Sequence, residues 1–202
     1  CLMCSIDNLK LDDEAGFQEL VQKMENLSET HPNISFTGGE PTEHSKILEI
    51  VEKAKELGFE KIHVSTNGVN FSDKDFTDKI VENGLTDINI AIHGPKEIHN
   101  HITQKKSYQN VVEGLNNLRK HDVNITFDSV LTRSNIDRID EVWELAREHG
   151  VKKVGIVDLI IEGKILETGL ENLAIPFPKK KEFFQKHKDK FRGKTLFKAT
   201  NF

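Results

Sequence analysis

The sequence lacks several features that mark broad classes of protein. Cysteine occurs only at positions 1 and 4, so the chain cannot carry the disulfide framework of a small secreted domain. No run approaches the roughly 20 apolar residues of a membrane-spanning helix, and no secretory h-region is present. No Gly-x-Gly-x-x-Gly follows a predicted strand, so a dinucleotide-binding fold has no fingerprint here. With 36% hydrophobic and 30% charged residues, the composition predicts a soluble globular protein, and we expect a cytoplasmic location.

The net charge of −5 is unevenly distributed along the chain. Residues 179–198 contain nine Lys or Arg and two Asp or Glu, a local charge of +7, so the rest of the chain carries −12. An acidic body argues against general nucleic-acid binding, and we expect neither a nucleic-acid nor a membrane partner. Behind Pro176 and Pro178, aromatic residues recur at helical spacing over residues 179–192. We expect a helix that packs against the acidic body; the alternative is a site for a phosphate-rich substrate.

Helical and strand-like patterns alternate along the chain. Amphipathic helices are predicted for residues 12–27, 43–57, 73–83, 108–121 and 135–149, the first behind a cap at Asp12 or Asp13. Three of them end at a glycine, which readily adopts the left-handed turn that leads into a strand. Predicted strands end near residues 37, 65, 92, 130 and 158, the spacing of βα units of about 30 residues. The pattern predicts an α/β fold of parallel strands, either an open sheet or a barrel.

Polar or glycine-rich groups stand at the carboxyl ends of these strands, where α/β enzymes bind ligands. The candidate ligand-binding residues are Gly38, Gly39, Glu40, Pro41, Ser65, Thr66, Asn67, His93, Thr126 and Asp128. Thr126 and Asp128 alternate within one strand, so both should point to the same face. Paired glycines let a ligand approach the backbone, whose carbonyls can accept hydrogen bonds from an ammonium group, and Glu40 adds a charged acceptor. The alternative is an ordinary loop between a strand and a helix.

The pair Cys1 and Cys4 can bind a soft metal through its thiolates. Two thiolates do not complete a zinc site, which takes four ligands, and no histidine follows at a typical spacing. An iron–sulfur cluster also takes cysteine thiolates. From these residues alone, a redox pair or a chance match accounts for most such spacings.

The order of these motifs resembles that of the radical S-adenosylmethionine (radical SAM) superfamily over about residues 1–165. A cysteine loop, a helix and a strand lead to Gly-Gly-Glu-Pro, and a further helix and strand lead to Thr-Asn-Gly. The family's hallmark is C-x3-C-x2-C; Cys1 and Cys4 match its second and third cysteines, and the first is expected upstream of the given chain. The resemblance implies a partial (β/α)6 TIM-like barrel of parallel strands whose first strand is largely missing upstream. Residues 166–202 are then expected to form a short C-terminal extension with a basic amphipathic helix.

The resemblance also implies roles for the candidate residues. Cys1 and Cys4 would be metal ligands to a 4Fe–4S cluster, and the ten residues at the strand ends would bind SAM, with His93 near the ribose. Relatives often carry Lys and Asn where this chain has Thr126 and Asp128, which is a departure from the family pattern.

Other histidines and aromatic residues have simpler explanations. His99 and His101 are expected to line a loop, with substrate binding or proton transfer as the alternative. Tyr108 and Trp143 lie in predicted amphipathic helices, where packing is the expected role.

The activity implied by the resemblance is reductive cleavage of SAM by the cluster to a 5′-deoxyadenosyl radical. The radical would abstract hydrogen from an unidentified small-molecule or peptide substrate, in peptide modification or cofactor biosynthesis. An electron donor such as ferredoxin or flavodoxin would be a partner. The alternatives are a non-redox α/β enzyme or small-ligand-binding domain, and a degenerate member of the family that serves as a scaffold.

Overall fold

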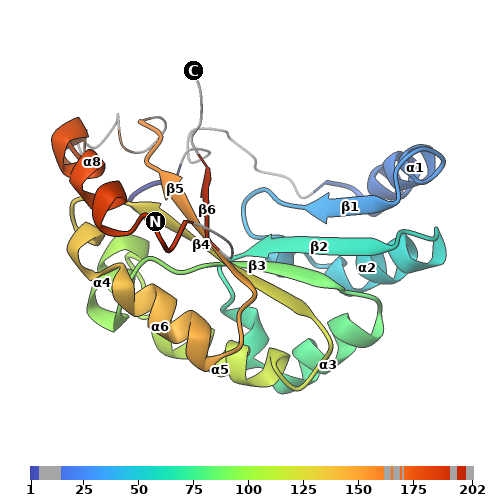
Figure 1. Ribbon diagram of the computed structural model, residues 1–202. Coiled ribbons are helices and arrows are strands. Elements are labelled where there is room, and N and C mark those ends of the chain that lie inside the picture. The colour runs from blue at the N-terminus through green and yellow to red at the C-terminus, as the bar shows by residue number, and fades with distance from the viewer. Residues whose placement is uncertain (5–14, 162–164, 166–168, 170, 192–194, 199–202) are drawn as a thin grey trace. The chain divides into compact units, whose positions relative to one another are not determined.

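The computed structural model describes residues 1–4, 15–161, 165, 169, 171–191 and 195–198 (Figure 1). The chain divides into two compact units. Unit 1 comprises Cys1–Leu9, Ala91–Gln109 and Thr126–Phe202, and unit 2 comprises Lys10–Ile90 and Asn110–Ile125. In the described part of the chain, every helix is too short or too polar to cross a lipid bilayer.

Unit 2 is built on three parallel strands. They are β1 (Asn33–Phe36), β2 (Lys61–Thr66) and β3 (Asp87–Ala91), whose last residue belongs to unit 1. Because β2 pairs with both of its neighbours, the strands follow one another in the sheet as they do in the chain. The helices of this unit are α1 (Phe17–Ser28), α2 (Ile47–Glu56), α3 (Lys74–Glu82) and most of α5 (Tyr108–Leu118). Of these, α2, α3 and α5 lie along one face of the strands (Figure 1).

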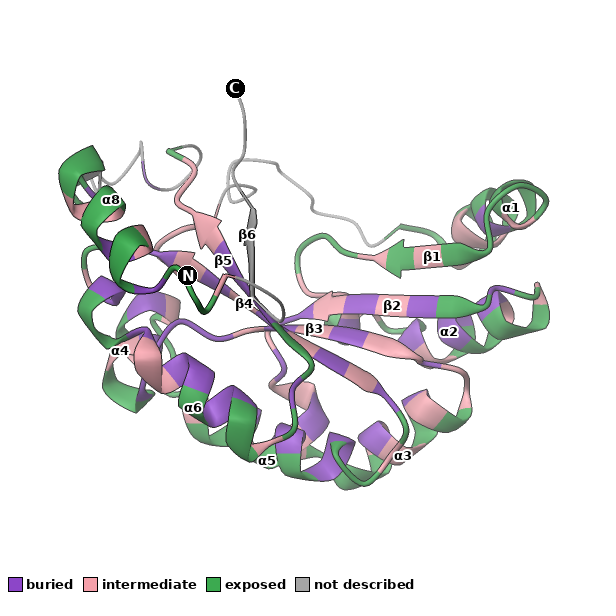
Figure 2. Cartoon of the chain, in the orientation of Figure 1, coloured by how far each residue is buried: buried purple, intermediate pink, exposed green. Residues whose placement is uncertain are grey.

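The two faces of this sheet differ in character. Buried and half-buried side chains alternate along β2 and β3, as the purple and pink bands in Figure 2 show. The buried side chains are Ile62, Val64, Thr66, Ile88 and Ile90. The half-buried face is largely polar and carries His63, Ser65, Asp87 and Asn89. A parallel sheet covered by apolar layers on both sides would be apolar on both faces, so this second face is suited to polar contacts.

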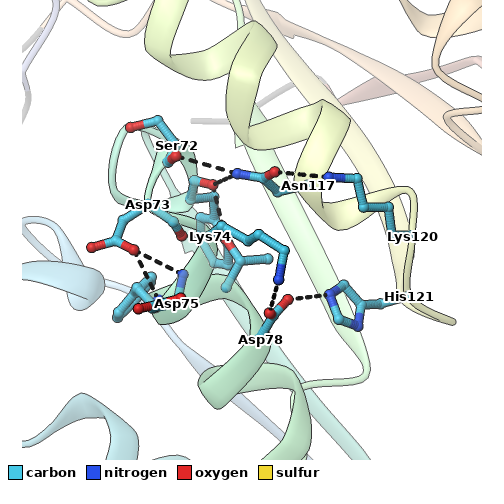
Figure 3. A network of polar contacts seen from close by, with 11 residues as sticks. Ser72, Asp73, Lys74, Asp75, Asp78, Asn117, Lys120 and His121 are labelled. Atoms are coloured by element: carbon cyan, nitrogen blue, oxygen red, sulfur yellow. Dashed lines mark hydrogen bonds and ion pairs between the residues drawn. The ribbon is translucent and has the colours of Figure 1, made fainter.

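Hydrogen bonds from side chains fix the connection between β2 and α3 (Figure 3). Asp73 caps α3 by accepting hydrogen bonds from the first free backbone amides of the helix. Asn117 of α5 donates from Nδ2 to the carbonyls of Phe71 and Ser72, at 3.0 and 3.2 Å. A Cβ atom added at Gly114 would lie 2.9 Å from Phe71 Cβ, so glycine permits the close approach of α5 to this turn.

Unit 1 contains the parallel strands β4 (Asn124–Leu131), β5 (Lys153–Asp158) and β6 (Thr195–Lys198), again in chain order. The first two residues of β4 belong to unit 2. The helices of unit 1 include α4 (Lys96–Thr103), α6 (Asp140–Glu148) and α8 (Phe177–Lys186). Buried and half-buried residues alternate without a break along β4. Thr126 and Asp128 share its half-buried face, as the sequence predicts.

Helix α8 packs against α6 of the same unit. Phe183 is 5% exposed, and its ring lies parallel to that of Trp143, with 6.4 Å between centroids and 10° between planes. Lys179 and Lys180 pair with Asp137 and Asp158 at 2.8 and 2.5 Å. These contacts agree with the interpretation that the basic helix docks on the acidic body through an aromatic side. The helix ends at Lys186, however, earlier than the predicted residue 192.

The predicted strand ends fall within one residue of those observed. Two helix predictions need correction, because short 3-10 turns precede α2 and α6, at Pro41–Glu43 and Ile136–Arg138. The prediction that His99 and His101 line a loop is wrong, since both lie in helix α4. Ile102 of the same helix is buried. The helix predicted from residue 12 begins at Phe17, and the proposed caps Asp12 and Asp13 lie outside the described residues.

Candidate functional site

The loop after β1, in unit 2, is organised around the carboxylate of Glu40. Oε1 accepts hydrogen bonds from the backbone amide and hydroxyl of Thr42, at 3.2 and 2.7 Å, and from Thr66 Oγ1 at 2.6 Å. Oε2 accepts a hydrogen bond from the backbone amide of Asn67 at 2.6 Å. Both oxygens are therefore engaged, and the carboxylate joins the Gly-Gly-Glu-Pro loop to the end of β2.

The turn after β2 is held by its own side chains. Thr66 Oγ1 accepts from the amide of Gly68 at 3.0 Å, and Asn67 Oδ1 accepts from the amide of Val69 at 2.8 Å. Gly68 has φ of 79°, and a Cβ atom added there would lie 2.9 Å from Ile90 Cγ2. Asn70 Nδ2 donates to the carbonyl of Thr42 at 2.9 Å, which closes a second link to the loop after β1. Two consecutive strand ends thus form one hydrogen-bonded assembly.

This arrangement changes the interpretation of Glu40. The sequence suggested a charged acceptor for a ligand ammonium group, but four protein donors already surround the carboxylate. Gly38 and Gly39 are exposed, and a Cβ atom added to either would meet nothing within 4 Å. A ligand can therefore approach the backbone of this loop, while Glu40 holds the loop in shape.

In unit 1, His93 follows β3 and is 6% exposed. Its Nδ1 accepts a hydrogen bond from the backbone amide of Val130 at 3.3 Å. Asn135, fully buried, donates from Nδ2 to the carbonyls of His93 and Val130, at 2.9 and 2.8 Å. Burial, with a smaller contribution from neighbouring His99, lowers the pKa of His93 to about 3. The ring is therefore neutral at pH 7, and its one proton lies on Nε2.

Asp128 lies against a glycine on the neighbouring strand of unit 1. Its register partner in β5 is Gly155, and a Cβ atom added at Gly155 would overlap Asp128 Oδ1. The backbone of Asp128 is also held, because the amide of Ile92 donates to its carbonyl at 3.0 Å. Gly155 therefore decides where the carboxylate can lie.

The two cysteines of unit 1 are free thiols, Cys1 exposed and Cys4 half-buried. The segment between them is anchored by a hydrogen bond from the amide of Leu2 to the carbonyl of Ile102 in α4, at 2.9 Å. Among the described residues no group of three or more His, Cys, Asp or Glu side chains is placed to hold a metal ion. The thiols fit two positions of an iron–sulfur cluster, which takes thiolate ligands, and do not form a closed zinc site.

Several residues that the sequence did not single out take part in these arrangements. They are Thr42 in unit 2, and Ser107, Asn135 and Gly155 in unit 1. A glycine inside a strand pattern, as at Gly155, is a recognised signal of close approach by a neighbouring group. The other three gave no comparable signal, because a polar residue in a helix or loop is usually solvated.

Comparison with known proteins gives one family-model match, described as the radical SAM superfamily, over residues 1–145. Curated relatives include the probable GTP 3′,8-cyclase of Sulfurisphaera tokodaii, 30% identical over 129 residues, or 63% of this chain and 41% of the relative. The probable GTP 3′,8-cyclase of Saccharolobus solfataricus is 31% identical over 129 residues, again 63% of this chain and 41% of the relative. The chain thus spans about two fifths of the length of these curated relatives.

Solved structures resemble the whole chain in fold. SuiB of Streptococcus suis bound to S-adenosylmethionine aligns with a TM-score of 0.72 at 14% identity, covering 100% of this chain and 47% of SuiB. Native anSMEcpe with bound AdoMet and the Kp18Cys peptide aligns with a TM-score of 0.75 at 20% identity, covering 96% and 59%. These likenesses confirm the predicted fold class, an α/β partial barrel of parallel strands.

Proposed function

The chain belongs to the radical SAM superfamily, and we propose that it forms the catalytic core of an enzyme that cleaves S-adenosylmethionine reductively and abstracts hydrogen from a substrate. The predicted family is confirmed, and the expected cofactors, SAM and an iron–sulfur cluster, are those of the family. The observation that carries the proposal is the Gly-Gly-Glu-Pro loop, locked to the end of β2 by Glu40.

Cys1 and Cys4 are the proposed metal ligands. Both are free thiols at the position of the family's cysteine motif, which supports this assignment. When bound, the cluster supplies the electron for cleavage of a sulfur–carbon bond in SAM. The remaining task of this chain is to bind and orient the cofactor and to exclude water from the reacting atoms.

In unit 2, the loop Gly38–Pro41 is proposed to bind the methionine end of SAM. Its two glycines are exposed, and their backbone carbonyls offer acceptors to an ammonium group. Glu40 acts as the positioning residue, because its carboxylate fixes the loop from behind. Ser65, Thr66 and Asn67 form the adjoining wall, in which Thr66 and Asn67 donate to Glu40.

In unit 1, His93, Thr126 and Asp128 are proposed to contact the nucleoside end of SAM. His93 offers a neutral N–H donor, and Asp128 offers a carboxylate acceptor beside Gly155. Thr126 shares the face of Asp128 on β4, where its short side chain leaves room for a ligand.

The substrate is proposed to be a small molecule or a peptide. The curated relatives are probable GTP 3′,8-cyclases, and solved structures of SuiB and anSMEcpe hold a precursor peptide and the Kp18Cys peptide. We further propose a ferredoxin or flavodoxin as electron donor and a cytoplasmic location. Residues 1–165 would form the core domain, and residues 166–202 its C-terminal extension.

The decisive experiment is SAM binding by variants of Glu40, measured by anaerobic equilibrium dialysis on the cluster-loaded, full-length protein. Glu40→Ala leaves four donor groups without their acceptor, the side chain of buried Thr66 among them. Loss of one charge-assisted hydrogen bond changes a dissociation constant by about tenfold. We therefore expect the dissociation constant for SAM to rise at least about tenfold. The dissociation constant of Glu40→Gln should lie between those of the wild type and Glu40→Ala, because the glutamine amide cannot accept a hydrogen bond from every donor.

Glu43→Ala is the matched control. It removes the same charge three residues away, from an exposed side chain in the same loop. Equal SAM affinities for Glu40→Ala and Glu43→Ala would contradict the proposal that the loop is part of the SAM site.

The cluster is tested separately by iron and sulfide analysis. One 4Fe–4S cluster gives about four irons per chain, and Cys1→Ser and Cys4→Ser should each lower that content. Stoichiometric zinc without sulfide would contradict the proposal, whatever the Glu40 variants do.

A further inference from the structure

A set of hydrogen bonds joins the backbone of His93 to His99, Ser107 and Thr103 in unit 1. His99 of α4 is 1% exposed, and its Nδ1 accepts from the backbone amide of His93 at 3.4 Å. Its Nε2 lies 3.1 Å from Ser107 Oγ, which lies 3.3 Å from Thr103 Oγ1. Thr103 Oγ1 in turn donates to the carbonyl of His99 at 2.9 Å. Thr103 Oγ1 also lies 3.2 Å from the carbonyl of Lys105, so the set branches at Thr103.

The tautomer of His99 follows from an obligatory donor. A backbone amide can only donate, so His99 Nδ1 carries no proton and the proton of the neutral ring is on Nε2. Nε2 then donates to Ser107, and Thr103 Oγ1 donates to the carbonyl of His99 or of Lys105. Burial lowers the pKa of His99 to about 4, which keeps the ring neutral at pH 7.

The same reasoning applies to His93. The backbone amide of Val130 donates to its Nδ1, so this lone pair is occupied and the proton is on Nε2. A ring in this state can donate a hydrogen bond, but at neutral pH it has no free lone pair with which to take a proton. It is also uncharged, which suits a neutral acceptor such as a ribose hydroxyl better than a phosphate.

The backbone around the pair leaves little freedom for either ring. Gly94 has φ of 140°, and a Cβ atom added there would lie 3.0 Å from Ile98 Cγ2. The ring planes of His93 and His99 are stacked, with 5.9 Å between centroids, and Tyr108 meets His99 edge-on at 5.8 Å. A shift of His99 would therefore be passed to the backbone and the ring of His93.

We propose that His99, itself held by Ser107, is a positioning residue that keeps His93 as a fixed neutral hydrogen-bond donor to the nucleoside of the cofactor, and that His93 is not a catalytic base. The ligand group facing Nε2 is then an uncharged oxygen or nitrogen acceptor. This assignment rests on the proposed function for the identity of the ligand, but the tautomers of the two rings follow from the protein alone.

The first test is the tautomeric state of the histidines, measured by long-range proton–nitrogen NMR on protein labelled with ¹⁵N-histidine, before and after SAM is added. Both rings are expected to be neutral with the proton on Nε2 at pH 7, and single-residue variants assign the signals. A charged ring, or a proton on Nδ1 of His93, would overturn the proposal.

The second test uses two substitutions that separate the ring nitrogens of His99. His99→Asn places an oxygen acceptor at the position of Nδ1 and loses the bond to Ser107. His99→Gln reaches the position of Nε2 and loses the acceptor for the amide of His93. The expected change in SAM affinity is a loss of about tenfold for His99→Gln and a smaller one for His99→Asn. His101→Gln, at an exposed position of the same helix, should leave affinity unchanged.

The two outcomes separate this inference from the proposed function. If the wild-type protein loads a cluster but binds no SAM, the proposed function fails, while the tautomers remain measurable in the same sample. If SAM binds and the folded variants His99→Gln, His99→Asn and His101→Gln all match the wild type, His99 has no positioning role and the inference is wrong.

Discussion

Replacing Phe183 with alanine should release α8 from α6. The ring is 5% exposed and makes contacts with Trp143, His187 and Phe191, at centroid distances of 6.4, 4.5 and 6.2 Å. Removal of a buried phenylalanine ring costs about 3–5 kcal/mol in the core of a protein. Because α8 is a single helix that can shift toward the space left behind, we expect the lower end, about 3 kcal/mol.

The two largely exposed ion pairs of α8 should not compensate for this loss. The pairs of Lys179 with Asp137 and of Lys186 with Asp140 are largely exposed, and exposed pairs contribute about 0–1 kcal/mol each. The assay is thermal unfolding together with hydrogen exchange of residues 177–186, because local release of one helix need not unfold the whole chain. If unfolding is global, 3 kcal/mol lowers the melting temperature by about 6–12 °C in a chain of this size.

Phe177→Ala is the matched control on the same helix. Its side chain is 77% exposed, and an exposed substitution of this kind changes stability by about 0.5 kcal/mol or less. If Phe183→Ala and Phe177→Ala have equal effects on melting and on exchange, α8 does not dock through Phe183, and the basic helix is free to bind a phosphate-rich ligand instead.

Two further predictions concern the candidate site. Gly155→Ala should displace the carboxylate of Asp128 and lower the free energy of unfolding by about 1–3 kcal/mol. In urea unfolding, the double variant that also carries Asp128→Ala should recover most of that loss. If it does not, the overlap between the added Cβ atom and Asp128 Oδ1 is not the cause. Burial lowers the pKa of folded His93 and His99 to about 3 and 4. Below the ordinary histidine pKa of about 6.5, the unfolded chain therefore binds more protons than the folded chain. The free energy of unfolding should fall as pH drops from 6.5 toward 4, by up to about 1.4 kcal/mol per pH unit for each ring. Urea unfolding at pH 7.0 and 5.5 measures this slope, and His99→Asn should reduce it by the share of one ring; an unchanged slope would contradict the buried neutral state of His99.

The sequence by itself predicted most elements in their observed order, although not α4 or β6, and it indicated the strand ends as the place of a candidate site. Apolar spacing and helix-ending glycines are local properties of a segment, so the strand ends could be placed within one residue. The motifs at those ends were also local, which is why Gly38–Pro41 and the Cys1 and Cys4 pair indicated the family before any fold was known. The short helix α4 was missed because bonds between separate segments support it, including the one that the Tyr108 amide donates to Asn100 Oδ1 at 3.0 Å.

Only the tertiary structure decided which groups each candidate residue contacts. The sequence indicated that Glu40 is an acceptor for a ligand. In the structure, Thr66 and Asn67, more than 25 positions away, donate hydrogen bonds to its carboxylate. The tautomer of His93 depends on the amide of Val130, 37 positions further along the chain. Hydrogen bonds of this kind depend on distances that must be right to a few tenths of an ångström, between segments that only the folded chain brings together. The pattern of a single segment could therefore not reveal them.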